Sequence, residues 1–208
     1  MRFLHTSDWH LGKSLYHMSL LKNQKNALDQ VADLLVARQV DGLIVAGDIY
    51  DRRVPPEEAV TLLDSFLHRV CVELEIPAFI IAGNHDSGER LGFGSGLLSS
   101  KGLNVAGPIT EVIEPHTLTI GEESVDIFLI PYAHPRVAAN KFELESATHE
   151  SALEALLDRA RSKQTDGRPS ILVSHCFVAG GESSDSERTL SVGGSEQVAA
   201  SLFYGFTY

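Results

Sequence analysis

Phe79-Ile80-Ile81-Ala82-Gly83-Asn84-His85-Asp86 passes from an apolar run directly into a cluster of polar residues. Two earlier stretches are built in the same way. Phe3-Leu4 precedes Ser7-Asp8-Trp9-His10, and Leu43-Ile44-Val45-Ala46 precedes Gly47-Asp48. Short apolar runs of this kind are typical of buried β-strands. The repetition predicts three neighbouring strands, each followed closely by side chains that can bind a metal ion.

Each cluster on its own is typical of an ordinary turn. Three clusters of Asp, His and Asn at strand ends, however, rarely arise from turn chemistry alone. Strand ends that lie side by side would bring Asp8, His10, Asp48 and Asn84 into one small volume, which is what a two-metal hydrolase needs. A later apolar stretch, residues 170–174, is followed by His175. This histidine either caps the sheet or, as the repeated pattern favours, is a further ligand.

The motifs Asp8-X-His10, Gly47-Asp48-X-X-Asp51 and Gly83-Asn84-His85-Asp86, with the later His175, resemble the signature of the calcineurin-like metallophosphoesterases. The longer stretches His5–Gly12 and Val45–Asp51, and the Pro55-Pro56 that follows, resemble the SbcD and Mre-type nuclease subunits that act on DNA double-strand breaks. The resemblance covers nearly the whole chain, and its first three motifs are highly specific in combination.

On this resemblance we expect two divalent metal ions. Asp48 would bridge them, Asp8 and His10 would hold one ion, and Asn84 and His175 would hold the other. Carboxylate and amide oxygens suit Mg²⁺ and Mn²⁺, whereas imidazole suits Zn²⁺, iron and Mn²⁺. The mixed donor set therefore favours Mn²⁺.

His85 follows the ligand Asn84 and, if its loop turns as in relatives, points at the substrate. Histidine has an intrinsic pKa near neutrality, which suits it to give a proton to the leaving oxygen. We therefore expect His85 to be catalytic, the alternative being that it only forms a hydrogen bond to Asp86 or a backbone carbonyl. Asp51 and Asp86 are expected to lie behind the ligands and orient histidines.

One departure from the family pattern concerns its closing Gly-His-X-His motif, which supplies one histidine to each metal. No such motif is present in the 208 residues. The segment 202–208 resembles the one that precedes the motif in relatives. We therefore expect residues 1–208 to be a metallophosphoesterase nuclease domain that is cut short before this motif, which would leave each metal without one imidazole.

The length of 208 residues favours a single domain with one sizeable core. The apolar runs are too short to cross a bilayer, and the first residues lack the hydrophobic region of a signal peptide. Cys71 and Cys176 have neither disulfide nor zinc spacing. These features predict a cytoplasmic protein without a membrane segment.

A net charge of −11 argues against a broadly basic DNA-binding surface. Contacts with DNA would therefore be local or shared with a partner. Four basic residues stand beside the predicted ligand loops and are candidates for phosphate contacts, the alternative for each being an ordinary solvated cation: Lys13, Arg52, Arg53 and Arg90.

Apolar residues recur at helical spacing over residues 20–38 and 55–74, and the second helix begins favourably with prolines and glutamates. Short β segments are expected at Val105, 112–113, 118–120 and 125–130, followed by a helix over about 150–161. The glycine-rich segment 180–188 predicts a mobile loop over the site. We expect an α/β (α+β) protein, a two-sheet β-sandwich flanked by helices, of metallophosphoesterase type.

The resemblance implies a Mn²⁺-dependent DNA nuclease, an exonuclease or endonuclease, that works in break repair with an SMC-like ATPase subunit of the SbcC type. Such subunits form homodimers through helices near the N-terminus, so residues 20–38 and 55–74 are candidate contact surfaces. Two alternatives stay open: a small-molecule phosphodiesterase or phosphatase of the same superfamily, and a catalytically impaired scaffold that only binds a partner.

Overall fold

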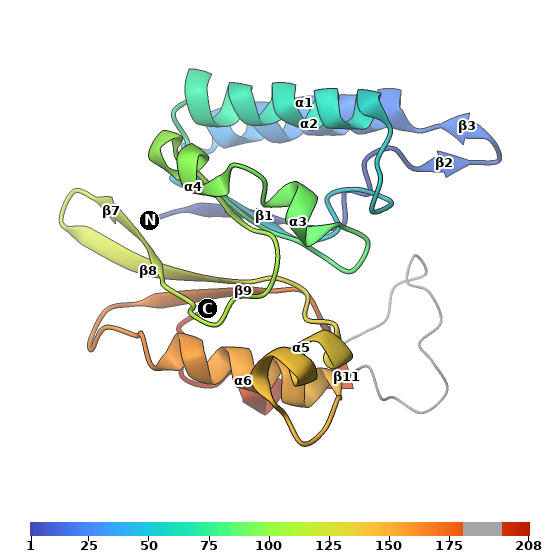
Figure 1. Ribbon diagram of the computed structural model, residues 1–208. Helices are drawn as coiled ribbons and strands as arrows, with labels where there is room; N and C mark the ends of the chain where they lie inside the picture. Colours follow the sequence, from blue (N-terminus) through green and yellow to red (C-terminus); the bar gives the residue numbers. More distant parts are fainter. Residues whose placement is uncertain (181–196) are drawn as a thin grey trace.

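Two sheets face each other as a sandwich in the computed structural model, which describes residues 1–180 and 197–208 (Figure 1). The first sheet is parallel, with the strand order β1-β4-β5-β6. The second has the order β7-β8-β9, and β8 pairs antiparallel to β7 and parallel to β9. The strands are β1 Phe3–Thr6, β4 Gly42–Ala46, β5 Ala78–Ile81, β6 Leu103–Ala106, β7 His116–Ile120, β8 Glu123–Ile130 and β9 Ser170–Ser174.

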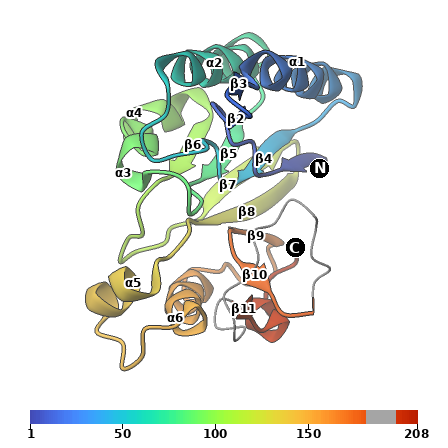
Figure 2. The same cartoon turned by 90° about the vertical axis from the view of Figure 1, so that its right-hand side faces the viewer.

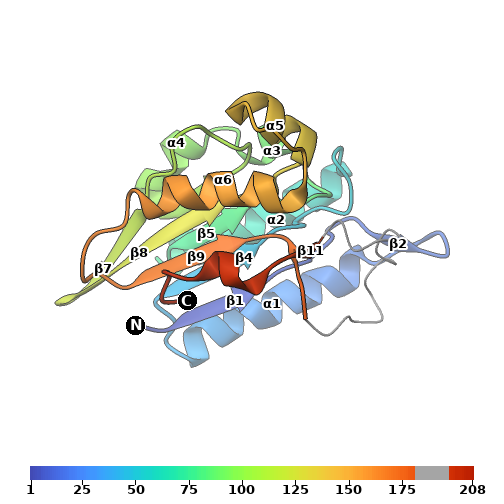
Figure 3. The same ribbon diagram turned by 90° about the horizontal axis from the view of Figure 1, so that it is seen from below.

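Helices cover both outer faces of the sandwich. Helices α1 and α2 lie side by side over the first sheet, and α6 crosses the second, as the view from below shows (Figures 1 and 3). The α-helices are α1 Leu21–Ala37, α2 Glu57–His68, α3 Gly88–Leu91, α4 Ser95–Leu98, α5 Pro135–Phe142 and α6 His149–Arg161. The remaining elements are the strand pairs β2 Ser14–Leu15 with β3 Met18–Ser19 and β10 Phe177–Val178 with β11 Gln197–Val198, a π-helical turn Arg69–Glu73, and 3-10 helices Ser99–Lys101 and Ala200–Phe203.

Three apolar clusters hold the layers together. The central one joins the inner faces of the two sheets, for example Ile44 and Phe79 against Ile127. The second cluster packs α1 and α2 on the first sheet, and the third packs α6 beneath the second sheet. All five residues of β4 are buried, because this strand has neighbours on both edges and apolar layers on both faces. The predicted two-sheet sandwich flanked by helices is confirmed.

Some expected elements differ from those observed. Residues 112–113 do not form a strand; Ile113 is instead a buried member of the cluster beneath the second sheet. The second helix is regular only to His68 and then widens into the π-helical turn. The expected loop 180–188 lies, apart from Gly180, outside the described residues. None of the helices in the described ranges is long and apolar enough to cross a membrane.

Candidate metal centre

The strands that precede the predicted ligands all end at one edge of the sandwich, which is on the right in Figure 1 and faces the viewer in Figure 2. Asp8 and His10 follow β1, Asp48 follows β4 and Asn84 follows β5, and these three strands are neighbours in one sheet. His175 follows β9 in the facing sheet. Loops at the carboxyl ends of parallel strands commonly carry binding sites. The fold thus brings the five predicted ligands together from both sheets.

His10 lies close to two carboxylates. Its Nε2 is 3.8 Å from Asp8 Oδ1 and also 3.8 Å from Asp48 Oδ2. These separations are shorter than twice a metal–ligand bond of about 2.0–2.2 Å. One ion could therefore be bonded to all three atoms. The three side chains form one of two groups of possible metal ligands among the described residues.

His175 approaches the other carboxylate oxygen of Asp48, and the side chain of Asn84 lies beside His175. His175 Nε2 is 3.0 Å from Asn84 Oδ1 and 3.6 Å from Asp48 Oδ1. His175 Nδ1 lies 2.8 Å from the carbonyl oxygen of Ala46. A nitrogen that faces a carbonyl in this way carries the proton, which leaves a lone pair on Nε2 of the neutral ring. In that form Nε2 and Asn84 Oδ1 both offer lone pairs, and their 3.0 Å separation is shorter than twice a metal–ligand bond of about 2.0–2.2 Å, so one ion could bind both atoms.

Asp48 links the two groups of ligands. Its side chain is 4% exposed, and the partners that carry or can carry positive charge within the described residues are imidazoles, at 3.6 to 4.0 Å: His10, His85 and His175. Burial of a carboxylate costs several kcal/mol unless the charge is paired or coordinates a metal. Two cations shared by Asp48 would meet this requirement, so the residues present fit the bridging role expected for it.

The backbone at the ligands is in an uncommon conformation. Asp8, His10 and Asp48 have φ values of 56°, 46° and 50°. For residues other than glycine this left-handed region costs on the order of 1–3 kcal/mol each, and it persists only where the surroundings impose it. The first two ligand loops impose it on each other, because the N–H of Asp8 donates to the carbonyl of Gly47 and that of His10 to the carbonyl of Asp48.

Two motif glycines leave room for the ligands. A Cβ atom at Gly47, whose φ is 92°, would lie 2.5 Å from His175 Nδ1. A Cβ atom at Gly83 would lie 2.1 Å from Asp48 Oδ1. Real Cβ contacts are not this short. The glycines that precede Asp48 and Asn84 are therefore required by ligands from other loops.

Asp86 has partners other than the histidines that we expected it to orient. Its carboxylate accepts hydrogen bonds from the backbone N–H groups of Ile49, Tyr50 and Gly83, at 3.0, 2.8 and 2.8 Å. Burial raises the pKa of Asp86, and these three amides oppose the rise. The expected partner was wrong because the loop turns Asp86 inward, where it ties the Asp48 loop to the Asn84 loop.

Asp51 lies between His10 and His85. His85 Nδ1 is 2.9 Å from the carbonyl oxygen of Asp51, and the Asp51 carboxylate is 3.7 Å from His10 Nδ1. His10 Nδ1 is buried without a hydrogen-bond partner among the described residues. Burial lowers the pKa of His10, although the negative charge of Asp48 opposes this. A neutral imidazole is the form that binds a metal.

The four basic residues that we selected as phosphate contacts are all exposed. Within the described part of the chain, none of them forms an ion pair with an acidic side chain: Lys13, Arg52, Arg53 and Arg90. Their positions directly after the first, second and third ligand loops follow from the sequence. They are therefore placed where they could meet a phosphate chain.

Two contacts of the site carried no signal in the sequence. The carbonyl of Ala46, which faces Nδ1 of His175, is a backbone group. The side chain of Gln24 in α1 reaches the loop that carries His10. Both depend on how distant segments meet, and residue type does not reveal that.

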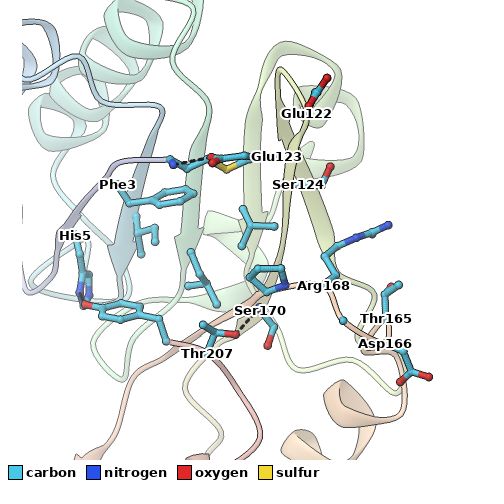
Figure 4. A pocket seen from close by; sticks show the side chains of 17 residues that line it. Phe3, His5, Glu122, Glu123, Ser124, Thr165, Asp166, Arg168, Ser170 and Thr207 are labelled. Atoms are coloured by element: carbon cyan, nitrogen blue, oxygen red, sulfur yellow. Dashed lines mark hydrogen bonds and ion pairs between the residues drawn. The ribbon is translucent and has the colours of Figure 1, made fainter.

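One cavity lies away from the candidate centre. It has a volume of about 980 Å³ and is lined by β1, β8, β9 and the last residues, among them Phe3, His5, Arg168 and Thr207 (Figure 4). None of the five predicted ligands lines it. The candidate centre is therefore an arrangement of loops at the strand ends.

Comparisons with known proteins identify the family of the chain. The family model described as calcineurin-like phosphoesterase matches residues 1–202. The chain is 35% identical over 209 residues to the SbcD component of the nuclease SbcCD from Staphylococcus epidermidis, a match that covers 100% of this chain and 55% of that protein. The chain thus spans about half the length of this relative.

Two solved structures are also similar. The nuclease MPE of Pseudomonas putida is 17% identical, with a TM-score of 0.37, and the match covers 86% of this chain and 65% of that one. The phosphoesterase Yfce of E. coli is 18% identical, with a TM-score of 0.32, over 64% of this chain and 58% of that one. On the evidence of the family match over residues 1–202, with the ligand loops in place, the chain belongs to the calcineurin-like phosphoesterase family.

Proposed function

We propose that the protein is a metal-dependent DNA nuclease that hydrolyses phosphodiester bonds in DNA break repair and works in the cytoplasm. The observation that carries this proposal is the convergence of donor side chains from the ends of β1, β5 and β9 around the buried carboxylate of Asp48, which follows β4. The 35% identity to a component of a nuclease favours DNA over a small ester as the substrate.

Asp8 and His10 would hold one divalent ion, Asn84 and His175 would hold the other, and Asp48 would be shared by both. Carboxylate, amide and imidazole donors together favour Mn²⁺. When bound, two such ions polarise the phosphate and lower the pKa of a bound water. The protein's part is to hold the five donors on loops that the two sheets fix in place, three of them, Asp8, His10 and Asp48, with positive φ.

His85 gives the proton to the leaving oxygen. Its Nδ1 is engaged by the Asp51 carbonyl at 2.9 Å, which fixes the ring and leaves Nε2 toward the ligands, 4.0 Å from Asp48 Oδ2. A hydrogen bond to a backbone carbonyl was the alternative role expected for His85. This contact, however, occupies only one of the two ring nitrogens. For this step both ring nitrogens must carry a proton, and the ring gives up the one on Nε2.

DNA approaches this edge against a net charge of −11, so local cations must offset the repulsion. Lys13, Arg52, Arg53 and Arg90 contact the phosphates on either side of the scissile bond. Contacts of this kind position a nucleic acid without reading its sequence.

By analogy with the SbcCD relative, the protein pairs with an SbcC-type, SMC-like ATPase. It also forms a homodimer through α1 and α2. These helices present exposed apolar side chains at Leu34, Val36 and Val60. Analytical ultracentrifugation tests the dimer: Leu34→Glu should shift the protein toward monomer, and a monomeric wild type would exclude a dimer of this chain alone.

Cleavage of linear duplex DNA tests the function itself. We expect cleavage in Mn²⁺ that chelation abolishes and that Asp48→Asn removes. Hydrolysis of a nitrophenyl phosphodiester with DNA left intact would instead identify a small-molecule phosphodiesterase. Failure to take up Mn²⁺, with no hydrolysis of either substrate, would leave a binding scaffold as the function.

A further inference from the structure

Helix α1 contacts the first ligand loop through the side chain of Gln24. The Nε2 group donates to the carbonyl oxygens of Trp9 and His10, at 3.2 and 2.7 Å, and Oε1 accepts from the N–H of Gly12 at 3.1 Å. Both functions of the amide are therefore used. The three contacts are therefore made with His10, a predicted metal ligand, and with residues on either side of it.

The loop needs such support. Three of its five residues from Asp8 to Gly12 have positive φ: 56° at Asp8, 46° at His10 and 87° at Gly12. A conformation of this kind persists only where neighbouring groups impose it. Gln24 binds the carbonyl that follows the strained Cα of His10 and the amide of Gly12, so it acts on the peptide groups that set the direction of the imidazole.

Among side chains of this size, an amide is required. Gln24 has to donate to two carbonyls and accept from one N–H, and only Asn and Gln offer both functions in one planar group. A glutamate at position 24 could still accept from Gly12, but its second oxygen would face the carbonyls of Trp9 and His10 without a proton to give. A methionine would fill the space and leave three backbone groups without their partner.

The helix that carries Gln24 is a rigid support. Gln24 is in its first turn, and Leu28, four residues later on the same face, is 4% exposed within the core. Phe66 of the neighbouring helix α2 packs edge-on against Trp9 of the loop, with 5.3 Å between the ring centroids. The loop is thus held by both helices of the outer layer.

We propose that Gln24 is a positioning residue that fixes the first ligand loop so that His10 presents Nε2 to the metal ion it shares with Asp8 and Asp48. The inference rests on the proposed function, since that ion belongs to it. Residues that support metal ligands from behind typically change metal affinity by about 10–100-fold when replaced.

The test measures Mn²⁺ affinity by calorimetry and by the electron paramagnetic resonance of bound Mn²⁺, in wild type, Gln24→Met, Gln24→Glu and the control Asn23→Ala. Asn23 is exposed and adjacent to Gln24 on the same helix. We expect affinity at one of the two ion sites to fall about 10–100-fold in both Gln24 variants, and to stay at the wild-type value in the control. Hydrogen exchange of the metal-free proteins should show faster exchange at Leu11–Lys13 in the two Gln24 variants only.

The outcomes separate the two proposals. Wild-type protein that binds no Mn²⁺ would overturn the proposed function, and this inference with it. If the wild type binds two ions and the Gln24 variants have unchanged affinity and an unchanged Mn²⁺ spectrum, only the positioning role is overturned. A lower thermal midpoint in the Gln24 variants without a change in affinity would equally overturn it, because it would show a purely structural contact.

Discussion

At the scale of single residues, Gly83 is the position where the smallest change should have a large effect. A Cβ atom there would lie 2.1 Å from Asp48 Oδ1 and 2.2 Å from the Asp48 nitrogen, and the backbone nitrogen cannot move aside as a flexible side chain would. We expect Gly83→Ala to displace the bridging carboxylate, reducing Mn²⁺ affinity at least about 10-fold, and to destabilise the fold by about 1–3 kcal/mol. Calorimetry and urea denaturation measure the two effects.

The matched control is Gly96→Ala in α4. A Cβ atom at Gly96 has no neighbour within 4 Å. Alanine is a better helix former than glycine. The free energy of unfolding of this variant should therefore rise by up to about 0.5–1 kcal/mol, and its metal affinity should stay unchanged. Equal behaviour of the two variants would show that the contact with Asp48 is not what requires Gly83.

His85→Ala should separate catalysis from metal binding. The ring contacts the Asp51 carbonyl through Nδ1, and its removal leaves the five expected ligands in place. We expect the rate of DNA cleavage to fall by about 10²–10⁴, the usual contribution of a positioned proton donor, with Mn²⁺ affinity unchanged. Single-turnover cleavage with the exposed His68→Ala as control measures this. Full activity in the variant would rule out the role of His85 as the acid.

The candidate ligands could be selected from the sequence at this scale because each follows a strand end, and a strand end is visible as the close of an apolar run. What the sequence could not reveal are contacts that depend on the path of the backbone. Asp86 was expected beside a histidine and instead accepts three backbone N–H groups. The contact of Gln24 with Trp9 and His10 joins residues from different elements, and nothing in its position marks it.

At the scale of elements, the side chain of Asp126 in β8 forms hydrogen bonds with residues of, or next to, both neighbouring strands. It is 1% exposed, accepts hydrogen bonds from Thr117 of β7 at 2.6 Å and from Arg168, just before β9, at 3.0 Å. Burial alone would raise the pKa of Asp126, but these hydrogen bonds and the charge of Arg168 outweigh it, so the pKa is lowered. Buried hydrogen bonds to a charged group are worth about 1.5–3 kcal/mol.

A lowered folded-state pKa gives this contribution a defined pH dependence. The unfolded aspartate has a pKa of about 3.9, so the stabilisation is complete above that pH and is lost as the pH falls through the lower folded value. Asp126→Asn should therefore cost about 1.5–3 kcal/mol at pH 7, and the difference from wild type should shrink below about pH 4. Urea denaturation across pH 3–7 measures it, with the exposed Glu111→Gln as control. A difference that stays constant with pH would contradict this account.

Elements with a strong pattern were predictable, and those that depend on tertiary packing were not. β4 is apolar at all five positions because both of its faces are covered, so its sequence identifies a central strand. Residues 112–113 are also apolar, but they lie in a segment without regular structure, from which Ile113 packs into the core. Helix α5 has only Pro135 and Ala138 buried, which is too few apolar contacts to give a periodic pattern.

At the scale of the whole molecule, the two sheets contribute unequally to the site. The first sheet supplies four of the five expected ligands, and the second supplies His175. The central apolar cluster therefore fixes the distance between the two sets of expected ligands, and the candidate metal centre depends on the sandwich as a whole. The apolar runs of the sequence predicted both sheets, whereas their separation at the site follows from packing and could not be predicted.

The overall charge of −11 sets how such a molecule can bind DNA. Each phosphate contact contributes about −0.9 to the slope of log affinity against log salt, so four contacts predict a slope of about −4 at most. Arg53→Ala should reduce the magnitude of this slope by about 1. Fluorescence anisotropy measures the slope, with Ca²⁺ as the metal to prevent cleavage.

The control, Lys101→Ala, removes an exposed cation just before β6, at the opposite end of the strands, and should leave the slope unchanged. Equal slopes for wild type and Arg53→Ala would exclude Arg53 from the phosphate contacts, and a slope far steeper than about −4 would mean that DNA meets a larger basic surface than this chain offers.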